Sequence, residues 1–262
     1  MKCGWVNVCK RMPCGICGKP DWCIYNPQSG NWVCMRVESP TPTEKGWWHR
    51  GSEKPKFVPK PPPEVPEIDA AAMMQRFRLD TRSEQLDRLA TVLGVSTDSL
   101  TRTGCAYAAP HGAWAWPMVS GIGKTVGIRL RAENGQKWSV RGGREGIFVP
   151  NGSARTAYVV EGPTDLAACL TLGLWGIGRP SCRGSVSHTQ VAINRLHIQR
   201  AILISDNDGP GIEGAKALAS ELQIPVAAMI LPAKDLRQFL AYGGTRVLLD
   251  SLERQLVWRQ PR

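Results

Sequence analysis

The sequence predicts an α/β fold, in which a parallel sheet with flanking helices follows a small mixed region and an N-terminal cysteine-rich module. From residue 157 onward, short apolar runs alternate with helical stretches, as in a parallel sheet that carries helices on its faces. Residues 114–149 differ, because their short aromatic and branched runs are separated by glycine turns, which is typical of antiparallel strands. The third observation is that six of the nine cysteines precede residue 35.

The cysteine-rich segment has the spacing of a structural zinc site. Its pattern C-x2-C-x5-C-x10-C is formed by Cys14, Cys17, Cys23 and Cys34. A segment of about 40 residues buries too little apolar surface to fold alone, and one tetrahedral zinc ion makes up the deficit. Cys3, Cys9 and His49 remain alternative ligands. Tryptophans interleaved with Lys19 and Arg36 either pack this module or stack on unpaired bases.

The next two segments are a spacer and a helical region. Residues 50–67 contain six prolines, which favour an extended linker. Leu86, Leu89 and Leu93 recur at helical spacing behind Ser83, so residues 68–103 are expected to be helical. The resulting layout is a zinc module over 1–49, a linker over 50–67, a basic subdomain over 68–150, and an α/β domain with a C-terminal helix over 151–262.

Carboxylates follow three of the predicted parallel strands. Glu161 ends "AYVVEG", Asp206 and Asp208 end "AILISDND", and Asp235 follows "PVAAMILPAKD". Because the carboxyl ends of parallel strands meet at one sheet edge, we expect these groups to converge, with Asp165 supporting them one helical turn after Glu161. Two carboxylates about 4 Å apart repel by about 4 kcal/mol at an effective dielectric near 20. Mg²⁺ or Mn²⁺ relieves this repulsion, so the four groups are predicted metal ligands.

Bulk composition points to a polyanionic partner. The net charge is +11 and the isoelectric point is near 9.5, which suits nucleic acid or an anionic membrane surface. No apolar run approaches the roughly 18 residues of a membrane span. The N-terminus has no apolar stretch of a secretory signal, so a cytoplasmic location is expected, where cysteines more often bind metals than form disulfides.

Three segments resemble the signatures of the Toprim domain, which occurs in bacterial-type primases, topoisomerases, small nucleases and zinc-bearing recombination mediators. They are "VVEGPTDLAACLTLG", "ILISDNDGPGIEGAKAL" and "LPAKDLRQFL", within about residues 157–240. The preceding "WAWPMVSGIGKTVGIRLRAENGQKWSVRGGREGIFVP" is similar to the basic subdomain of bacterial and phage primases. The order of parts from about 12 to 240 resembles the primase half of phage primase-helicases, although the cysteine spacing departs from the usual two pairs.

The resemblance implies a primase that makes short RNA primers on single-stranded DNA. It implies two Mg²⁺ or Mn²⁺ ions, ribonucleoside triphosphates as substrates, and a replicative helicase acting in trans. Arg131 and Lys137 match positions that face template and nucleotide. Further predicted nucleic-acid or nucleotide contacts are Arg129, Arg141, Arg144 and Lys234.

Two rivals and two smaller ambiguities stay open. One rival is a non-catalytic zinc and Toprim recombination mediator that binds DNA, and the other is a Toprim nuclease. "GIGKT" over 121–125 resembles a phosphate loop, but Met118 stands where that loop needs glycine, so a hairpin turn is expected. Arg179 and Arg183 either grip a triphosphate or lie in a solvated loop.

Overall fold

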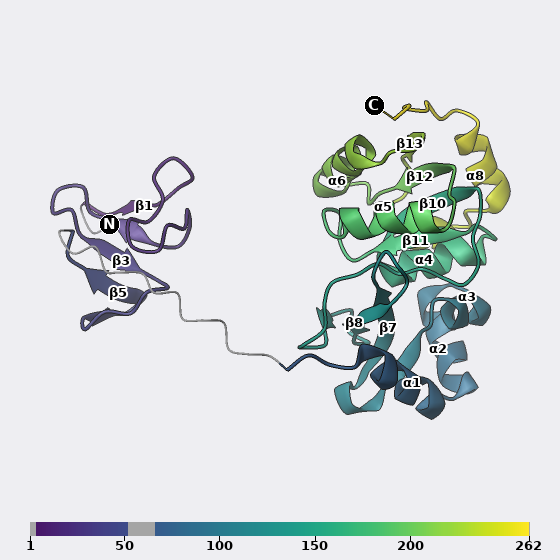
Figure 1. Ribbon diagram of the computed structural model, residues 1–262, viewed down its shortest axis with the longest axis horizontal. Helices are drawn as coiled ribbons and strands as arrows, with labels where there is room; N and C mark the ends of the chain where they lie inside the picture. Colours follow the sequence, from purple (N-terminus) through teal and green to yellow (C-terminus); the bar gives the residue numbers. More distant parts are fainter. Residues whose placement is uncertain (1–3, 52–65, 262) are drawn as a thin grey trace. The chain divides into compact units, whose positions relative to one another are not determined.

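The computed structural model describes residues 4–51 and 66–261, and the chain divides into two compact units, Met1–Glu64 and Val65–Arg262 (Figure 1). Most of the predicted linker and Cys3 lie outside the described residues. Among the helices described, none is both long enough and apolar enough to cross a membrane.

The first unit is a small antiparallel sheet with the strand order β1-β2-β3-β5-β4. Its strands are β1 (Val6–Asn7), β2 (Ile24–Tyr25), β3 (Trp32–Cys34), β4 (Pro42–Thr43) and β5 (Gly46–His49). Val8, Ile16 and three cysteines form its buried cluster. So small an apolar cluster gives little folding free energy, and this unit therefore needs another source of stability.

The second unit begins with three helices, α1 (Ala70–Asp80), α2 (Ser83–Leu93) and α3 (Thr97–Arg102). They occupy the segment that the leucine spacing predicts to be helical. The helix α2 ends at Gly94, which adopts a left-handed conformation with φ of 68°. One face of α1 packs through Met74 and Phe77 against Ile128 and Leu130 of the sheet that follows.

This second sheet is antiparallel, with the order β6-β7-β8-β9, and Figure 1 shows it below the parallel sheet of the same unit. Its strands are β6 (Ala106–Ala108), β7 (Ala113–Val119), β8 (Thr125–Arg131) and β9 (Lys137–Ser139). The "GIGKT" segment is the turn between β7 and β8, and the Ser120 amide donates to the Lys124 carbonyl across it at 2.8 Å. The hairpin turn expected from the sequence is therefore present.

The parallel sheet has the order β11-β10-β12-β13. Its strands are β10 (Thr156–Glu161), β11 (Gly176–Arg179), β12 (Arg200–Ile204) and β13 (Val226–Met229). The helices around it are α4 (Gly162–Thr171), α5 (Val186–Arg195), α6 (Gly209–Glu221), α7 (Leu236–Ala241) and α8 (Arg246–Glu253). The predicted parallel sheet with flanking helices is therefore confirmed.

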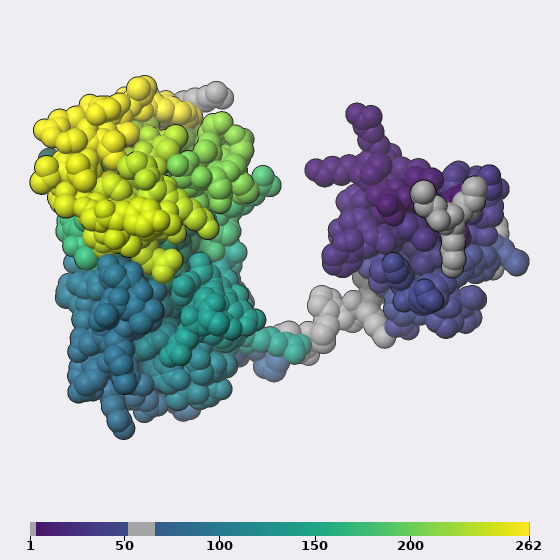
Figure 2. Space-filling view, turned by 180° about the vertical axis from the view of Figure 1, so that it is seen from behind, coloured from purple at the N-terminus to yellow at the C-terminus, as the bar shows by residue number. Residues whose placement is uncertain are grey.

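Alternate residues of the central strands enter two different cores. Tyr158 and Ile202 pack with α4, α7 and α8, whereas Val159 and Leu203 pack with α5 and α6. This alternation is the period of two that a strand imposes on its side chains, and it buries the sheet on both faces. In Figure 2 the C-terminal segment (yellow) and α1–α3 (blue) lie on the same face of this unit.

Candidate functional site

The strand order brings the predicted carboxylates to one edge of the parallel sheet. The neighbouring strands β10, β12 and β13 run in the same direction, and Glu161, Asp206 and Asp235 stand at or just after their carboxyl ends. We call Glu161, Asp206, Asp208 and Asp235 the acidic rim. Burial raises the pKa of Glu161, and the charges of Asp206 and Asp208 raise it further, as expected of like charges facing one another.

Two rim residues also cap helices. The Asp208 carboxylate accepts from the Gly211 amide at 2.8 Å at the start of α6, and Asp235 accepts from the Gln238 amide at 2.7 Å at the start of α7. One such bond leaves each carboxylate free to accept elsewhere. Among the hydrogen bonds of the described residues, none involves the side chains of Glu161 or Asp206. Helix capping therefore accounts for two of the four rim carboxylates and leaves Glu161 and Asp206 without this structural role.

Asp165 lies in the first turn of α4 and is only 8% exposed. It accepts from the Arg237 amide at 3.0 Å and so ties α4 to α7. Burial, followed by the charge of Asp235, raises the pKa of Asp165 to about 7. The pKa of Asp206 is raised as well, by burial first and then by Asp235 and Asp208. This accumulation of negative charge favours bound cations.

Cations from the antiparallel sheet face the rim. Arg131 and Lys137 are register partners on β8 and β9. Partial desolvation and Arg131 lower the pKa of Lys137, while Asp165 and Asp206 act in the opposite direction. These two predicted contacts therefore lie within electrostatic reach of the carboxylates. Lys234 is exposed, and its charge lowers the pKa of Asp206.

The other predicted cations lie differently. Arg129 donates to the Pro180 carbonyl at 2.9 Å, and Arg144 pairs with Glu67 at 3.0 Å. Arg141 is exposed in the loop after β9. The geometry thus brings Arg131, Lys137 and Lys234 to the rim and gives Arg129 and Arg144 partners elsewhere.

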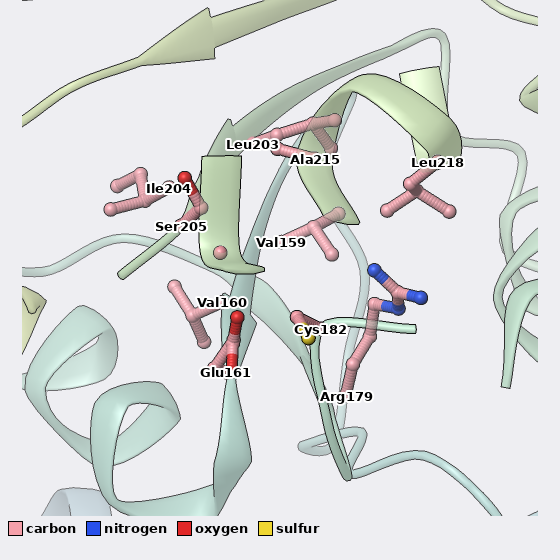
Figure 3. A pocket seen from close by; sticks show the side chains of 11 residues that line it. Val159, Val160, Glu161, Arg179, Cys182, Leu203, Ile204, Ser205, Ala215 and Leu218 are labelled. Atoms are coloured by element: carbon pink, nitrogen blue, oxygen red, sulfur yellow. The ribbon is translucent and has the colours of Figure 1, made fainter. Parts of the chain in front are cut away.

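For Arg179 the sequence allows two interpretations, a contact with a triphosphate or a position in a solvated loop. It ends β11 beside Glu161, and only 4% of it is exposed, so the solvated-loop reading of this residue is wrong. Its Nε and Nη2 both donate to the Gly184 carbonyl, at 3.0 and 2.7 Å. Glu161 and Arg179 line one small cavity (Figure 3). Its volume of about 20 Å³ is enough for one water molecule but too small for a nucleotide. The charge of Arg179 lowers the pKa of Glu161.

The acidic rim offers carboxylate oxygens, which are the type of ligand atom that divalent metal ions such as Mg²⁺ bind. Carboxylate oxygens are the protein ligands that Mg²⁺ prefers, and this ion usually keeps several waters. Within the described residues, only cysteines bring three or more ligating atoms within 4.8 Å of one another. The described carboxylates of the rim do not form a group of this compactness.

That compact group is the predicted zinc quartet, Cys14, Cys17, Cys23 and Cys34. The Sγ atoms of Cys17 and Cys23 are 3.8 Å apart, and those of Cys23 and Cys34 are 3.9 Å apart. Tetrahedral zinc with bonds of about 2.3 Å requires sulfur separations of about 3.8 Å. The Met35 amide also points at Cys23 Sγ, at 3.4 Å, as expected beside a thiolate.

The alternative zinc ligands in the described residues are not part of this group. His49 is buried, with Nε2 at 3.0 Å from the Val37 carbonyl, and Cys9 is exposed. Arg36 places Nη1 at 3.7 Å from Cys23 Sγ and pairs with Asp21 at 2.6 Å. A cation at this distance offsets part of the negative charge that four thiolates bring to one zinc ion.

Comparisons with known proteins identify solved structures that share this architecture. No protein-family profile and no curated protein matches the chain. The primase fragment of the bacteriophage T7 primase-helicase is 18% identical, with a TM-score of 0.52, over 97% of this chain and 100% of that chain. The zinc-binding and RNA polymerase domains of Aquifex aeolicus primase are 13% identical, with a TM-score of 0.56, over 95% and 79% of the two chains. The E. coli primase catalytic core is 14% identical, with a TM-score of 0.56, over 72% and 78%.

The class of fold is therefore that of a zinc-binding module joined to a primase-type catalytic core. More particularly, the chain has the fold of bacterial and phage primases along most of its length. At these identities the likeness establishes the fold alone.

Proposed function

We propose that the chain is a DNA-dependent primase that joins ribonucleotides into short primers on single-stranded DNA. One observation carries the proposal: on a primase fold, an acidic rim at the carboxyl ends of β10, β12 and β13 faces the paired cations Arg131 and Lys137. Carboxylates opposite cations suit a reaction that needs metal ions and a bound triphosphate together.

The carboxylates of the rim and Asp165 have different roles in nucleotide joining. Glu161, Asp206, Asp208 and Asp235 would hold two Mg²⁺ or Mn²⁺ ions. Bound there, such ions would supply activation of the attacking 3′-hydroxyl and neutralisation of charge on the triphosphate. Glu161, whose pKa is raised, is the group to which we assign the hydroxyl proton. Asp165 holds the start of α7, and with it Asp235, through the Arg237 amide.

The remaining parts bind and position substrates. Arg131, Lys137 and Lys234 contact the triphosphate and the template backbone, with Arg129, Arg141 and Arg144 adding positive charge. The cysteine quartet holds one structural zinc ion, and its unit contacts the template or the first nucleotide. A replicative helicase acts in trans to deliver the single strand.

The test is primer synthesis with labelled ribonucleotides and Mg²⁺ on a library of single-stranded templates, with and without helicases. Asp206→Ala combined with Asp208→Ala is expected to lower the yield at least 100-fold and to leave DNA binding in place, because an oxygen-ligand set for the metals is lost. Asp80→Ala, which removes an exposed carboxylate at the end of α1, is the control and should leave synthesis unchanged.

The rival functions give different results in the same assay. Cleavage of labelled strands without nucleotides would identify a nuclease. Binding without synthesis or cleavage, on every template and with every helicase, would refute the primase and leave a recombination mediator.

A further inference from the structure

A second cavity lies at the end of the fold opposite the acidic rim. It has a volume of about 510 Å³ and is lined by the ends of α1, α3 and α5 and by the β7–β8 turn. Leu196 and Gly152 contribute to its wall, and both precede strands of the parallel sheet rather than follow them. The turn is also the end of β8 away from Arg131. The cavity is therefore separate from the carboxylates.

The lining of this cavity is cationic. Arg78, Arg102 and Arg195 contribute side chains, while the residues described in its lining include no aspartate and no glutamate. The nearest ion pair joins Arg102 to Asp98 over 3.8 Å, and the Asp98 side chain is 76% exposed, so water screens it. Thr125 and Asn151 add a hydroxyl and an amide group, whereas the hydroxyls of Thr101 and Thr103 already donate to the Thr97 and Leu100 carbonyls. Three guanidinium groups with these two polar side chains favour an anion.

Glycines leave space for two of the guanidinium groups, and a hydrogen bond fixes one of them, that of Arg195. Arg195 donates from Nε to the Gly121 carbonyl at 2.9 Å, and a Cβ on Gly123 would lie 3.4 Å from its guanidinium carbon. Arg78 lies over Gly104 in the same way, 2.9 Å from where a Cβ would stand. Among the hydrogen bonds of the described chain, none uses the two terminal nitrogens of Arg195. The guanidinium group of Arg195 is thus oriented by one hydrogen bond, and its two terminal nitrogens remain as donors for a ligand.

The cavity suits phosphate rather than a nucleobase. Its volume lies in the range of small-ligand pockets, roughly 300–1,000 Å³. The described lining contains no aromatic side chain on which a base would stack. Guanidinium forks, together with the Thr125 hydroxyl and the Asn151 amide, match the several oxygens of a tetrahedral phosphate.

We propose that this cavity is a second anion site, which binds phosphate groups independently of the acidic rim and of any metal ion. Phosphates reach it either as the backbone of a nucleic-acid strand or as the phosphate chain of a free nucleotide. The "GIGKT" turn thus supplies Gly123 and Thr125 to a phosphate site, although it is not a phosphate loop in conformation.

The test measures binding of two probes to the full chain in EDTA, inorganic triphosphate and a fluorescent dT30 strand. Arg78→Ala combined with Arg195→Ala should weaken at least one probe fivefold or more relative to Arg76→Ala combined with Arg254→Ala. The control removes the same charge from exposed residues outside the cavity. Loss of two strand contacts should also lower the salt slope for dT30 by about 1.4.

Each outcome decides the proposal. Weakened triphosphate binding identifies the nucleotide phosphates as the ligand, and weakening of dT30 alone identifies the strand backbone. Less than a fivefold effect on both probes refutes the site. If the Arg195 change prevents folding, Arg78→Ala combined with Arg102→Ala is measured against the same threshold. Because EDTA removes divalent metals, the result stands apart from success or failure of primer synthesis.

Discussion

Asp165 shows how burial sets the chemistry of a single residue at this site. Its carboxyl group is almost fully buried, faces Asp235, and receives one backbone hydrogen bond from Arg237. Burial and the neighbouring charge both disfavour the ionised form, which is why its pKa rises to about 7. In the unfolded chain the same group ionises near pH 4.

This difference makes the stability of the metal-free protein depend on pH. Between about pH 4 and pH 7 the folded carboxyl keeps its proton while the unfolded one loses it, so the folded state binds more protons and stability falls as pH rises. Asp165→Asn has no such proton. The free energy of unfolding of wild type, minus that of the variant, should fall by up to about 4 kcal/mol across this window.

Urea unfolding in EDTA at several pH values, followed by far-UV circular dichroism, measures this difference. All helices of the described chain belong to the second unit, so the signal reports on the unit that holds Asp165. Asp80→Asn changes an exposed carboxyl that makes no ion pair within the described residues, and as the control it should show a much flatter difference. A flat difference for Asp165→Asn too would mean that its carboxyl titrates normally.

At the scale of elements, the start of α6 determines where the acidic rim stands. Gly211 is buried, and a Cβ there would overlap the carbonyl oxygen of Asp206. The Gly211 amide also donates to Asp208. The helix start and both aspartates therefore form one tightly packed turn, in which glycine is required for close approach rather than for an unusual φ.

Gly211→Ala is expected to push this turn apart. The overlap should destabilise the second unit by about 1–3 kcal/mol and lower primer synthesis at least tenfold. Gly209→Ala is the matched control, because nothing lies within 4 Å of the Cβ it would add, and its stability should stay within about 1 kcal/mol of wild type. Thermal unfolding and the primer assay measure both effects, and equal behaviour of the two variants would contradict the packing argument.

The same elements show what the sequence can predict. The meeting of Glu161, Asp206 and Asp235 follows from strand direction alone, so apolar runs ending in carboxylates were sufficient to predict it. The burial of Arg179 was not predictable, because arginine is usually exposed and its acceptor, the Gly184 carbonyl, comes from an irregular loop. The strand β6 was missed as well, since Ala106–Ala108 is short and mostly alanine.

At the scale of the whole molecule, the two units draw their stability from different sources. The second unit buries three apolar clusters around its two sheets. Among the residues described in the first, the small cluster around its cysteines is the only one. Metal binding worth on the order of 10 kcal/mol would exceed what that cluster supplies. Loss of zinc should therefore unfold the first unit and spare the second.

Hydrogen exchange of the full chain tests this separation. After zinc removal by a chelator, or in Cys23→Ser, amides in 4–51 should lose protection while those in 66–261 keep it. Cys9→Ser is the control, because Cys9 is an exposed cysteine outside the quartet, and it should retain one zinc ion per chain. If the chelator leaves the first unit protected, its sheet is stable without metal. If Cys9→Ser loses the zinc ion, the ligand set differs from the quartet whose sulfur atoms the fold brings together.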